Sequence, residues 1–250
     1  MSSEGGIYVF CTIEASMPKN LGKVIINGEE TAIYTIHHQD TAAVVSRVNG
    51  EVLPERQNLL AHQQGIMEVM KTHTVIPMSF GNVFNSEEDV ILILEHLSKE
   101  LKALFSQLEN KLEVGLKVVA KQKWIDGLIE QDPYLNEWKS GKKDASDPAL
   151  LYEKIQLGEQ VQRVFNHLEQ KAQEELFTPL FHAAESGKLN SIVPGKTILN
   201  AAFLIDREYE EAFDEKVNQL YEQWKERAEF KYSGPWPPYN FVNIRLRIEQ

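Results

Sequence analysis

The chain has 250 residues, of which 42% are apolar and 25% are charged. These fractions are close to those of ordinary globular proteins, so the composition argues against a disordered, a collagen-like or a disulfide-framework protein. The 37 acidic residues outnumber the 26 basic ones, which gives a net charge of −11 at pH 7. Because nucleic-acid binding depends on basic side chains that displace counterions from phosphates, nucleic acid is not expected as a partner.

The N-terminus does not resemble a leader sequence. Residues 1–4 lack the basic segment of a signal peptide, and the apolar run that follows ends at Glu14. The densest apolar run, 90–94, has five residues, whereas a membrane-spanning helix needs about 18. The single cysteine, Cys11, has no partner for an internal disulfide bond. We therefore expect a cytosolic protein that does not enter a lipid membrane, and the sequence specifies no oligomeric state.

The first third of the chain has the composition and the turns of β-strands. Residues 7–13 and 42–48 are rich in β-branched and aromatic side chains, which predicts buried strands. Between them, strands predicted at 24–26 and 32–36 flank the Asn-Gly pair at 27–28. This pair tolerates the positive φ angles of a tight hairpin turn. We expect the hairpin to lie at an edge of the sheet.

A helix is expected after Pro54. Its predicted apolar stripe consists of Leu59, Leu60, Ile66, Met67 and Met70. Residues 74–81 are then expected to be extended, because Pro77 cannot donate a hydrogen bond and disfavours helix in the residue before it.

The clearest helical signal begins at Ser86, which is a good N-cap ahead of three acidic residues. Apolar residues then recur at steps of three and four, at Val90, Leu94, Leu97, Leu101, Leu104 and Leu108. This spacing is typical of a coiled-coil seam, but it lasts for fewer than three heptads. We favour one helix packed on a sheet or on another helix over a seam that binds a partner.

The second half of the chain predicts further strands and long helices. Strands are expected at 113–120 and 197–205, and a strand-like run at 229–244 closes the chain. A long helix is expected from 149 to about 175, with Pro179 ending or kinking it. Asp206 is expected to cap a helix with a buried stripe made of Phe213, Val217, Leu220 and Trp224.

The order of these elements predicts an α+β fold with two domains. The polar, turn-rich stretch 131–148 is expected to be an exposed loop. Residues 1–110 would form an N-terminal mixed α/β sheet domain. Residues 111–250 follow a β-α-β-α-β order, which predicts a C-terminal ferredoxin-like α+β domain with long helices.

The sequence contains no convincing catalytic, cofactor or metal motif. Residues 195–197 (Gly-Lys-Thr) lack the earlier glycine of a phosphate-binding loop and precede a predicted strand instead of following one. None of the seven histidines forms an i, i+4 pair, and the neighbours His37 and His38 would point to opposite faces of a strand. Cys11 lies in an apolar strand, where a thiol is normally an inert small hydrophobe. Carboxylates are too frequent for any pair to indicate acid-base chemistry. We therefore expect no enzyme, no cofactor and no metal.

Four blocks of the sequence resemble the GvpF/GvpL family of gas vesicle proteins. They are Tyr-Val-Phe at 8–10, Thr-Val-Ile-Pro-Met-Ser-Phe-Gly-Asn-Val-Phe at 74–84, Glu-Val-Gly-Leu-Lys-Val at 113–118, and the terminal block 232–242. The blocks follow the family's order and together span nearly the whole chain, and the Pro-Trp-Pro part of the last block is the most specific. The predicted helix at 149–176 departs from the family pattern, because it is richer in Gln and Glu than in Lys, Arg and Ala.

The resemblance implies an accessory, minor structural protein of gas vesicles, found in the vesicle and in the cytoplasm. It implies a role in nucleation or assembly of the vesicle shell, through contacts with the hydrophobic shell protein GvpA and with other accessory proteins. It supplies no catalytic residues. An acidic, strand-rich protein is suited to pair with the exposed apolar strands of a shell monomer or to shield them.

Two segments are candidates for that contact. One is the edge hairpin with Ile25 and Ile33, and the other is the C-terminal segment with Trp236, Tyr239 and Phe241. Each has a simpler interpretation in which it completes the fold; the C-terminal segment would then be a rigid turn packed on the core and not a polyproline-type ligand. A ferredoxin-like module that senses a small molecule and an unrecognised hydrolase are the alternative functions.

Overall fold

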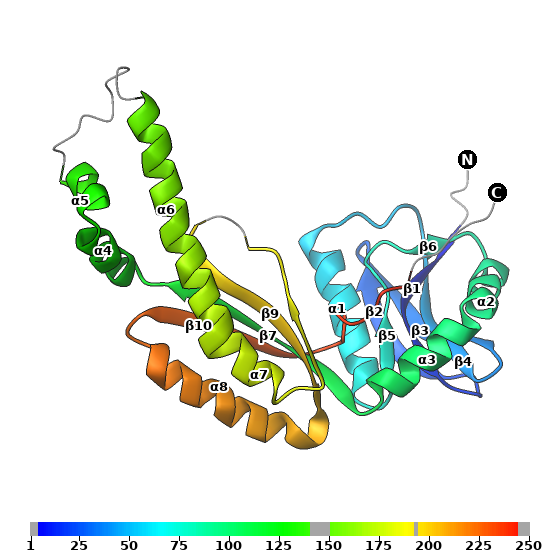
Figure 1. Cartoon of the computed structure of the whole chain (residues 1–250). Helices are drawn as coiled ribbons and strands as arrows, with labels where there is room; N and C mark the ends of the chain where they lie inside the picture. Colours follow the sequence, from blue (N-terminus) through cyan, green and yellow to red (C-terminus); the bar gives the residue numbers. More distant parts are fainter. Residues whose placement is uncertain (1–4, 141–150, 193–194, 245–250) are drawn as a thin grey trace. The chain divides into compact units, whose positions relative to one another are not determined.

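The computed structural model describes residues 5–140, 151–192 and 195–244 (Figure 1). The chain forms two compact units, one of residues 1–113 with 235–250 and one of residues 114–234. The expected division near residue 110 lies close to the first of these boundaries. Residues 235–250, which were expected in the second domain, group with the first unit instead.

The first unit is built on an antiparallel sheet of six strands, in the order β2-β3-β4-β1-β5 with β6 also paired to β1. The strands are β1 (Gly6–Glu14), β2 (Asn20–Ile26), β3 (Glu29–His38), β4 (Thr41–Val48), β5 (Val75–Pro77) and β6 (Val83–Phe84). The strands expected in this region are present, and β2 lies at an edge as predicted. The hairpin turn has φ angles of 53° at Asn27 and 78° at Gly28, which is the conformation that the Asn-Gly pair predicts.

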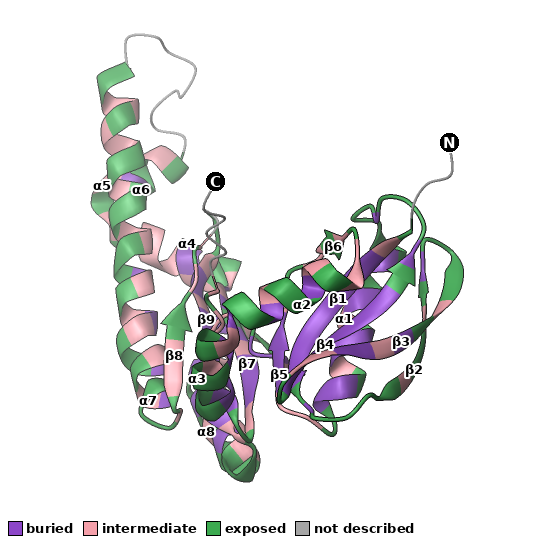
Figure 2. Ribbon diagram, turned by 90° about the vertical axis from the view of Figure 1, so that its right-hand side faces the viewer, coloured by how far each residue is buried: buried purple, intermediate pink, exposed green. Residues whose placement is uncertain are grey.

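Helices cover both faces of this sheet. On one face, α1 (Arg56–Met70) places Ile66, Val69 and Met70 in a core cluster with β1 and β4. On the other face, apolar side chains of α2 (Glu87–His96) and α3 (Ser98–Leu108) surround Val9 and Thr12 of β1. Strands β1 and β4 are consequently buried along most of their length (Figure 2). Among the described residues, no helix combines the length and the apolar character that crossing a bilayer requires.

Two expectations about the helices of this unit are wrong. Leu59 and Leu60 belong to the exposed side of α1, because Asn58 and His62 occupy the buried side and form hydrogen bonds there. The helix expected from 86 to 108 is two helices, separated at Leu97, whose φ of −91° and ψ of 2° interrupt the helical path. The regularly spaced apolar residues of the two helices still pack on the chain's own sheet, as the favoured interpretation predicted.

The second unit contains a four-stranded sheet in the order β10-β7-β9-β8. Its strands are β7 (Lys111–Ala120), β8 (Ser186–Leu189), β9 (Thr197–Asp206) and β10 (Ala228–Trp236). Its helices are α4 (Gln122–Gln131), α5 (Pro133–Lys139), α6 (Leu151–Ala172), α7 (Thr178–Phe181) and α8 (Glu210–Trp224), with a π-helical turn at Gln173–Phe177 and a 3₁₀ turn at Arg207–Tyr209. The resulting β-α-β-β-α-β order is that of a ferredoxin-like fold. The prediction lacked β8, a strand of only four residues.

The caps and stripes near the C-terminal end of this unit are as predicted. The Asp206 carboxylate accepts a hydrogen bond from the Glu208 amide at the start of the turn that leads into α8. All four residues of the predicted stripe are buried: Phe213, Val217, Leu220 and Trp224.

Pro179 does not end the long helix but follows a π-helical turn, in which the Thr178 amide donates to the Gln173 carbonyl. A proline, which has no N–H, is accommodated by such a rearrangement.

The prediction of an exposed loop at 131–148 is wrong over its first part. Residues 133–139 form α5, because the Asp132 carboxylate accepts hydrogen bonds from the Tyr134 and Leu135 amides and Pro133 suits the first helical turn. Leu135 is buried. Residues 141–148 lie outside the described part of the chain. The long helix expected from 149 is present as α6, in which the apolar residues Leu151, Ile155 and Val161 are exposed and the fully buried residues are Leu168 and Ala172.

Candidate interaction surface

An open groove with a volume of about 850 Å³ lies between α1 and the edge hairpin formed by β2 and β3. We call it the hairpin groove. Its apolar lining is contributed by Leu21 and Val24 of β2, Ile33 of β3, and Leu60, Ala61 and Met67 of α1. Residues 57, 60, 64, 67 and 71 recur along one flank of α1 at helical spacing and form one wall. The groove is therefore an apolar channel along an open sheet edge.

The charged residues that line the hairpin groove cancel one another. Lys23 forms an ion pair with Glu30 across the hairpin at 2.5 Å, and Lys71 forms one with Glu68 on α1 at 2.5 Å. Two positive and two negative charges sum to zero, whereas the whole chain carries −11. The groove lining is therefore locally neutral although the chain as a whole is acidic.

The hairpin is held in place by an asparagine pair. The Asn27 amide donates to the Asn58 Oδ1 atom at 2.9 Å, and Asn58 Nδ2 donates to the Asn27 side chain at 2.9 Å and to the Leu53 carbonyl at 3.0 Å. Asn58 is buried at the start of α1. This contact fixes the turn of the hairpin relative to α1, and no local pattern in the sequence indicates it.

The two hairpin residues predicted to contact a partner have different environments. Ile25 has 48% of its surface exposed and lies on the edge strand beside the hairpin groove. Ile33 lines the groove but is only 4% exposed, and its role as a partner contact stays a prediction. Its side chain is covered because β3 is the second strand from the edge and Ile33 belongs to the core cluster that residues of α1 share.

The C-terminal segment forms a turn that packs on the first unit. Pro237 and Pro238 are buried, and their carbonyls accept hydrogen bonds from the amides of Tyr239 (2.7 Å) and Phe241 (3.0 Å). The buried Glu113 carboxylate accepts hydrogen bonds from the Asn240 amide at 2.8 Å and from the Asn240 side chain at 2.6 Å. This anchoring explains why residues 235–250 group with the first unit.

The three predicted contact residues of this segment keep some exposure. Trp236 and Phe241 are half-buried, and Tyr239 is more exposed than either. None of the three lines the hairpin groove. Their role in binding a partner stays a prediction.

A buried cluster of aromatic side chains contains the one histidine in the core of the first unit. His62 is 5% exposed, its Nδ1 atom lies 2.8 Å from the Tyr8 hydroxyl, and its Nε2 atom lies 3.1 Å from the Met78 carbonyl. Because a carbonyl only accepts, Nε2 carries the proton and Nδ1 accepts from Tyr8. Burial lowers the pKa of His62 to about 4 and raises that of Tyr8 to about 12. These groups are neutral and enclosed, which suits a structural role.

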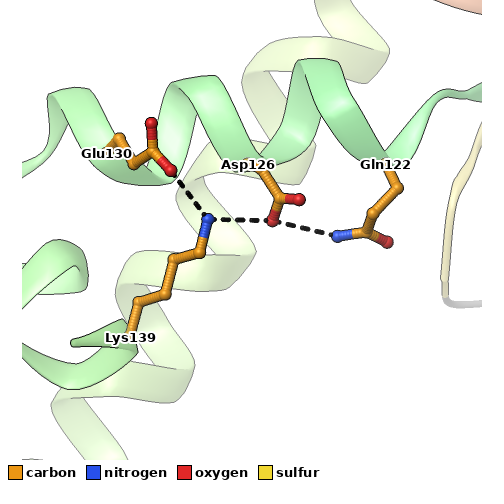
Figure 3. Close-up of polar contacts among 4 residues, drawn as sticks. All are labelled: Gln122, Asp126, Glu130 and Lys139. Carbon is orange, nitrogen blue, oxygen red and sulfur yellow. Dashed lines mark hydrogen bonds and ion pairs between the residues drawn. The ribbon is translucent and has the colours of Figure 1, made fainter. Parts of the chain in front are cut away.

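Cys11 and a cluster of charged residues around Lys139 also have structural environments. Cys11 is fully buried, and burial raises the pKa of its thiol. In the second unit, the Lys139 ammonium lies between the carboxylates of Asp126 (3.2 Å) and Glu130 (3.0 Å), and Gln122 donates to Asp126 (Figure 3). The hydrogen bonds from Gln122 and Lys139 lower the pKa of Asp126. These contacts tie α4 to α5 at the surface.

Comparisons with known proteins agree with the sequence resemblance. Gas vesicle protein F1 of Halobacterium salinarum is 26% identical over 223 residues, which cover 87% of this chain and 84% of that protein. Gas vesicle protein F of Dolichospermum flosaquae is 27% identical over 199 residues, or 77% of this chain and 79% of that protein.

The fold is similar to two crystal structures. GvpF from Anabaena sp. PCC7120 superposes with a TM-score of 0.80 at 20% identity, over 98% of this chain and 99% of that one. GvpF from Microcystis aeruginosa gives a TM-score of 0.76 at 22% identity, over 96% and 99% of the two chains. The family model described as gas vesicle synthesis protein GvpL/GvpF matches residues 6–243, nearly the whole sequence. The chain therefore belongs to the GvpL/GvpF family of gas vesicle synthesis proteins.

Proposed function

We propose that this protein takes part in the assembly of the gas vesicle shell by binding the shell protein GvpA through its first unit. The observation that carries the proposal is the hairpin groove, a largely apolar channel at an open sheet edge whose lining carries no net charge, in a chain that belongs to a gas vesicle family. Binding a protein partner, and not catalysis, is the activity that this surface supports best.

The physical need for such a partner follows from the chemistry of the shell. A shell subunit exposes apolar strands before it is incorporated, and exposed apolar strands aggregate unless they are covered. A partner with an apolar groove covers them transiently. Its net charge of −11 keeps the complex dispersed through electrostatic repulsion between copies.

Deletion of the gene in a vesicle-forming host tests the role in assembly. Gas vesicles scatter light until pressure collapses them, so the pressure-sensitive part of the scattering measures intact vesicles. We expect the deletion to abolish this signal and a plasmid copy of the gene to restore it. Normal pressure-sensitive scattering in the deletion strain would contradict the proposal.

Co-purification of GvpA with a tagged copy of the chain tests the groove. Leu60 lines the groove and is 45% exposed, whereas Leu92 on α2 is 51% exposed and lies outside it. Burying the exposed half of a leucine side chain contributes about 1 kcal/mol, or about fivefold in affinity. We expect Leu60→Ser to lower GvpA recovery about fivefold and Leu92→Ser, the matched control, to leave it unchanged. Equal recovery with both variants would exclude the groove.

A further inference from the structure

The register of the hairpin determines where the main-chain groups of β2 point. Ile26 lies opposite Glu29 across the two-residue turn, which makes this a hydrogen-bonded pair. Hydrogen-bonded and non-hydrogen-bonded pairs alternate along an antiparallel ladder. Ile25, opposite Glu30, and Lys23, opposite Ala32, therefore direct their N–H and C=O groups away from β3, toward the open edge.

No strand of the described chain pairs with that edge, since β2 is the outermost strand of its sheet. The opposite end of the sheet is different, because β5 has only three residues and includes Pro77, which has no N–H to offer. Strand β2 has seven residues. Of the two edge strands of this sheet, β2 is therefore the one that can offer a row of main-chain hydrogen-bond donors and acceptors to another strand.

The hairpin groove runs along this same edge. Its lining includes Lys23 and Ile25 of β2 together with Leu60 and Met67 on the flank of α1. A strand added beside β2 would alternate its side chains between the two faces of the sheet, so every second side chain would point toward α1. The groove supplies the apolar surface that such side chains need.

We infer that β2 accepts an extended, uncharged segment of a partner as an additional antiparallel or parallel strand, whose alternate apolar side chains fill the hairpin groove. A helix does not fit this edge as well, because a helix satisfies its own main-chain groups and would leave those of Lys23 and Ile25 without partners. Two copies of this chain, each with a net charge of −11, repel one another, whereas an uncharged segment meets no such repulsion. The inference rests on the proposed function, which supplies the partner: the apolar strands of the shell protein.

A proline substitution separates main-chain pairing from side-chain contact. Ile25→Pro removes the outward N–H and takes no hydrogen bond from the β2–β3 ladder. Ile25→Val is the matched control, because valine has as many side-chain carbons as proline and keeps the N–H. We expect Ile25→Pro to lower the recovery of co-expressed GvpA at least tenfold and Ile25→Val to stay within twofold of the unsubstituted chain. Equal recovery with both variants, or equal loss with both, would overturn strand addition.

Residue-resolved hydrogen exchange tests the same inference without a substitution. In the free chain, the amides of Lys23 and Ile25 should exchange fast, while those of Val24 and Ile26 are protected by β3. Binding of GvpA should slow exchange at Lys23 and Ile25 at least tenfold. A complex that forms without this protection would overturn the inference and leave the proposed function standing, whereas failure of the chain to retain any GvpA would count against the proposed function itself. A homodimer that protects these amides in the absence of GvpA would overturn the choice of partner.

Discussion

Acidification should destabilise the first unit through His62. This imidazole is enclosed by Tyr8, Phe10 and Phe80, with ring-centre distances of 5.6, 5.8 and 5.7 Å, and its two nitrogens are occupied by the Tyr8 hydroxyl and the Met78 carbonyl. A proton added at Nδ1 would place a charge in this apolar cluster. For this reason, burial lowers the pKa of His62 from its ordinary value of 6.5 to about 4.

The direction and size of the effect follow from the two pKa values. Between pH 6.5 and about 4, the unfolded chain binds a proton at this histidine and the folded chain does not. The free energy of unfolding therefore falls as the pH drops through this window and levels off below it. A difference of about 2.5 between the pKa values corresponds to about 3 kcal/mol. That is a large fraction of the stability of a typical domain.

Native-state hydrogen exchange at the amides of β1 and α1 measures this free energy for the first unit, after correction for the intrinsic pH dependence of exchange. We expect it to fall by about 3 kcal/mol between pH 7 and pH 4 in the unsubstituted chain. His62→Gln removes the titrating group and should abolish most of that fall, whatever its effect on stability at pH 7. An equal fall in both proteins, or an NMR titration of His62 with its midpoint near 6.5, would refute the reasoning.

Two further substitutions test the packing of the first unit. Asn58→Ala removes three hydrogen bonds around the hairpin turn and should lower the free energy of unfolding, measured by urea titration, by about 3 kcal/mol. The control, Asn49→Ala, lies at an exposed site with one side-chain hydrogen bond to Glu29 and should lower it by less than about 0.5 kcal/mol. Equal losses in the two variants would show that Asn58 does not anchor the hairpin. Gly65→Ala would place a methyl group 3.0 Å from the buried ring of Phe10, and overpacking of about 1–3 kcal/mol should outweigh a helix-propensity gain of about 1 kcal/mol. Gly158→Ala in α6, with open space around the new atom, should raise the melting temperature instead.

Local sequence signals predicted the elements that depend on neighbouring residues. The Asn-Gly turn, the Ser86 N-cap and the stripe of α8 have the predicted form, because each depends on residues only a few positions apart. The edge hairpin and the exposure of Ile25 were also predictable, since strand patterns and turn chemistry place them. The Asp132-Pro133 pair that begins α5 was a local signal of the same kind, and it was missed because the surrounding composition suggested a loop.

The hairpin groove could not be predicted in the same way. The groove depends on which face of α1 lies against the sheet. That face is determined by the hydrogen bonds that Asn58 and His62 form with Asn27 and Tyr8, which lie 31 and 54 positions earlier in the sequence. The apolar pattern alone favours Leu60 in the core, yet in the structure Leu60 forms a wall of the groove. A polar residue can be buried when its hydrogen-bonding partners are in place, and those partners are brought together only by the assembled fold. The apolar periodicity of the sequence therefore does not indicate which polar residues are buried.

By itself, the sequence determined that this is an acidic α+β protein of two parts, and its four motif blocks indicated the GvpF/GvpL family. Those conclusions rest on composition and on short segments whose preferences are intrinsic. Only the tertiary structure decided that Ile33 is buried beneath α1 and that Glu113 anchors the C-terminal turn to the first unit. Each of these depends on contacts between residues distant in the sequence, which form only when the whole unit packs.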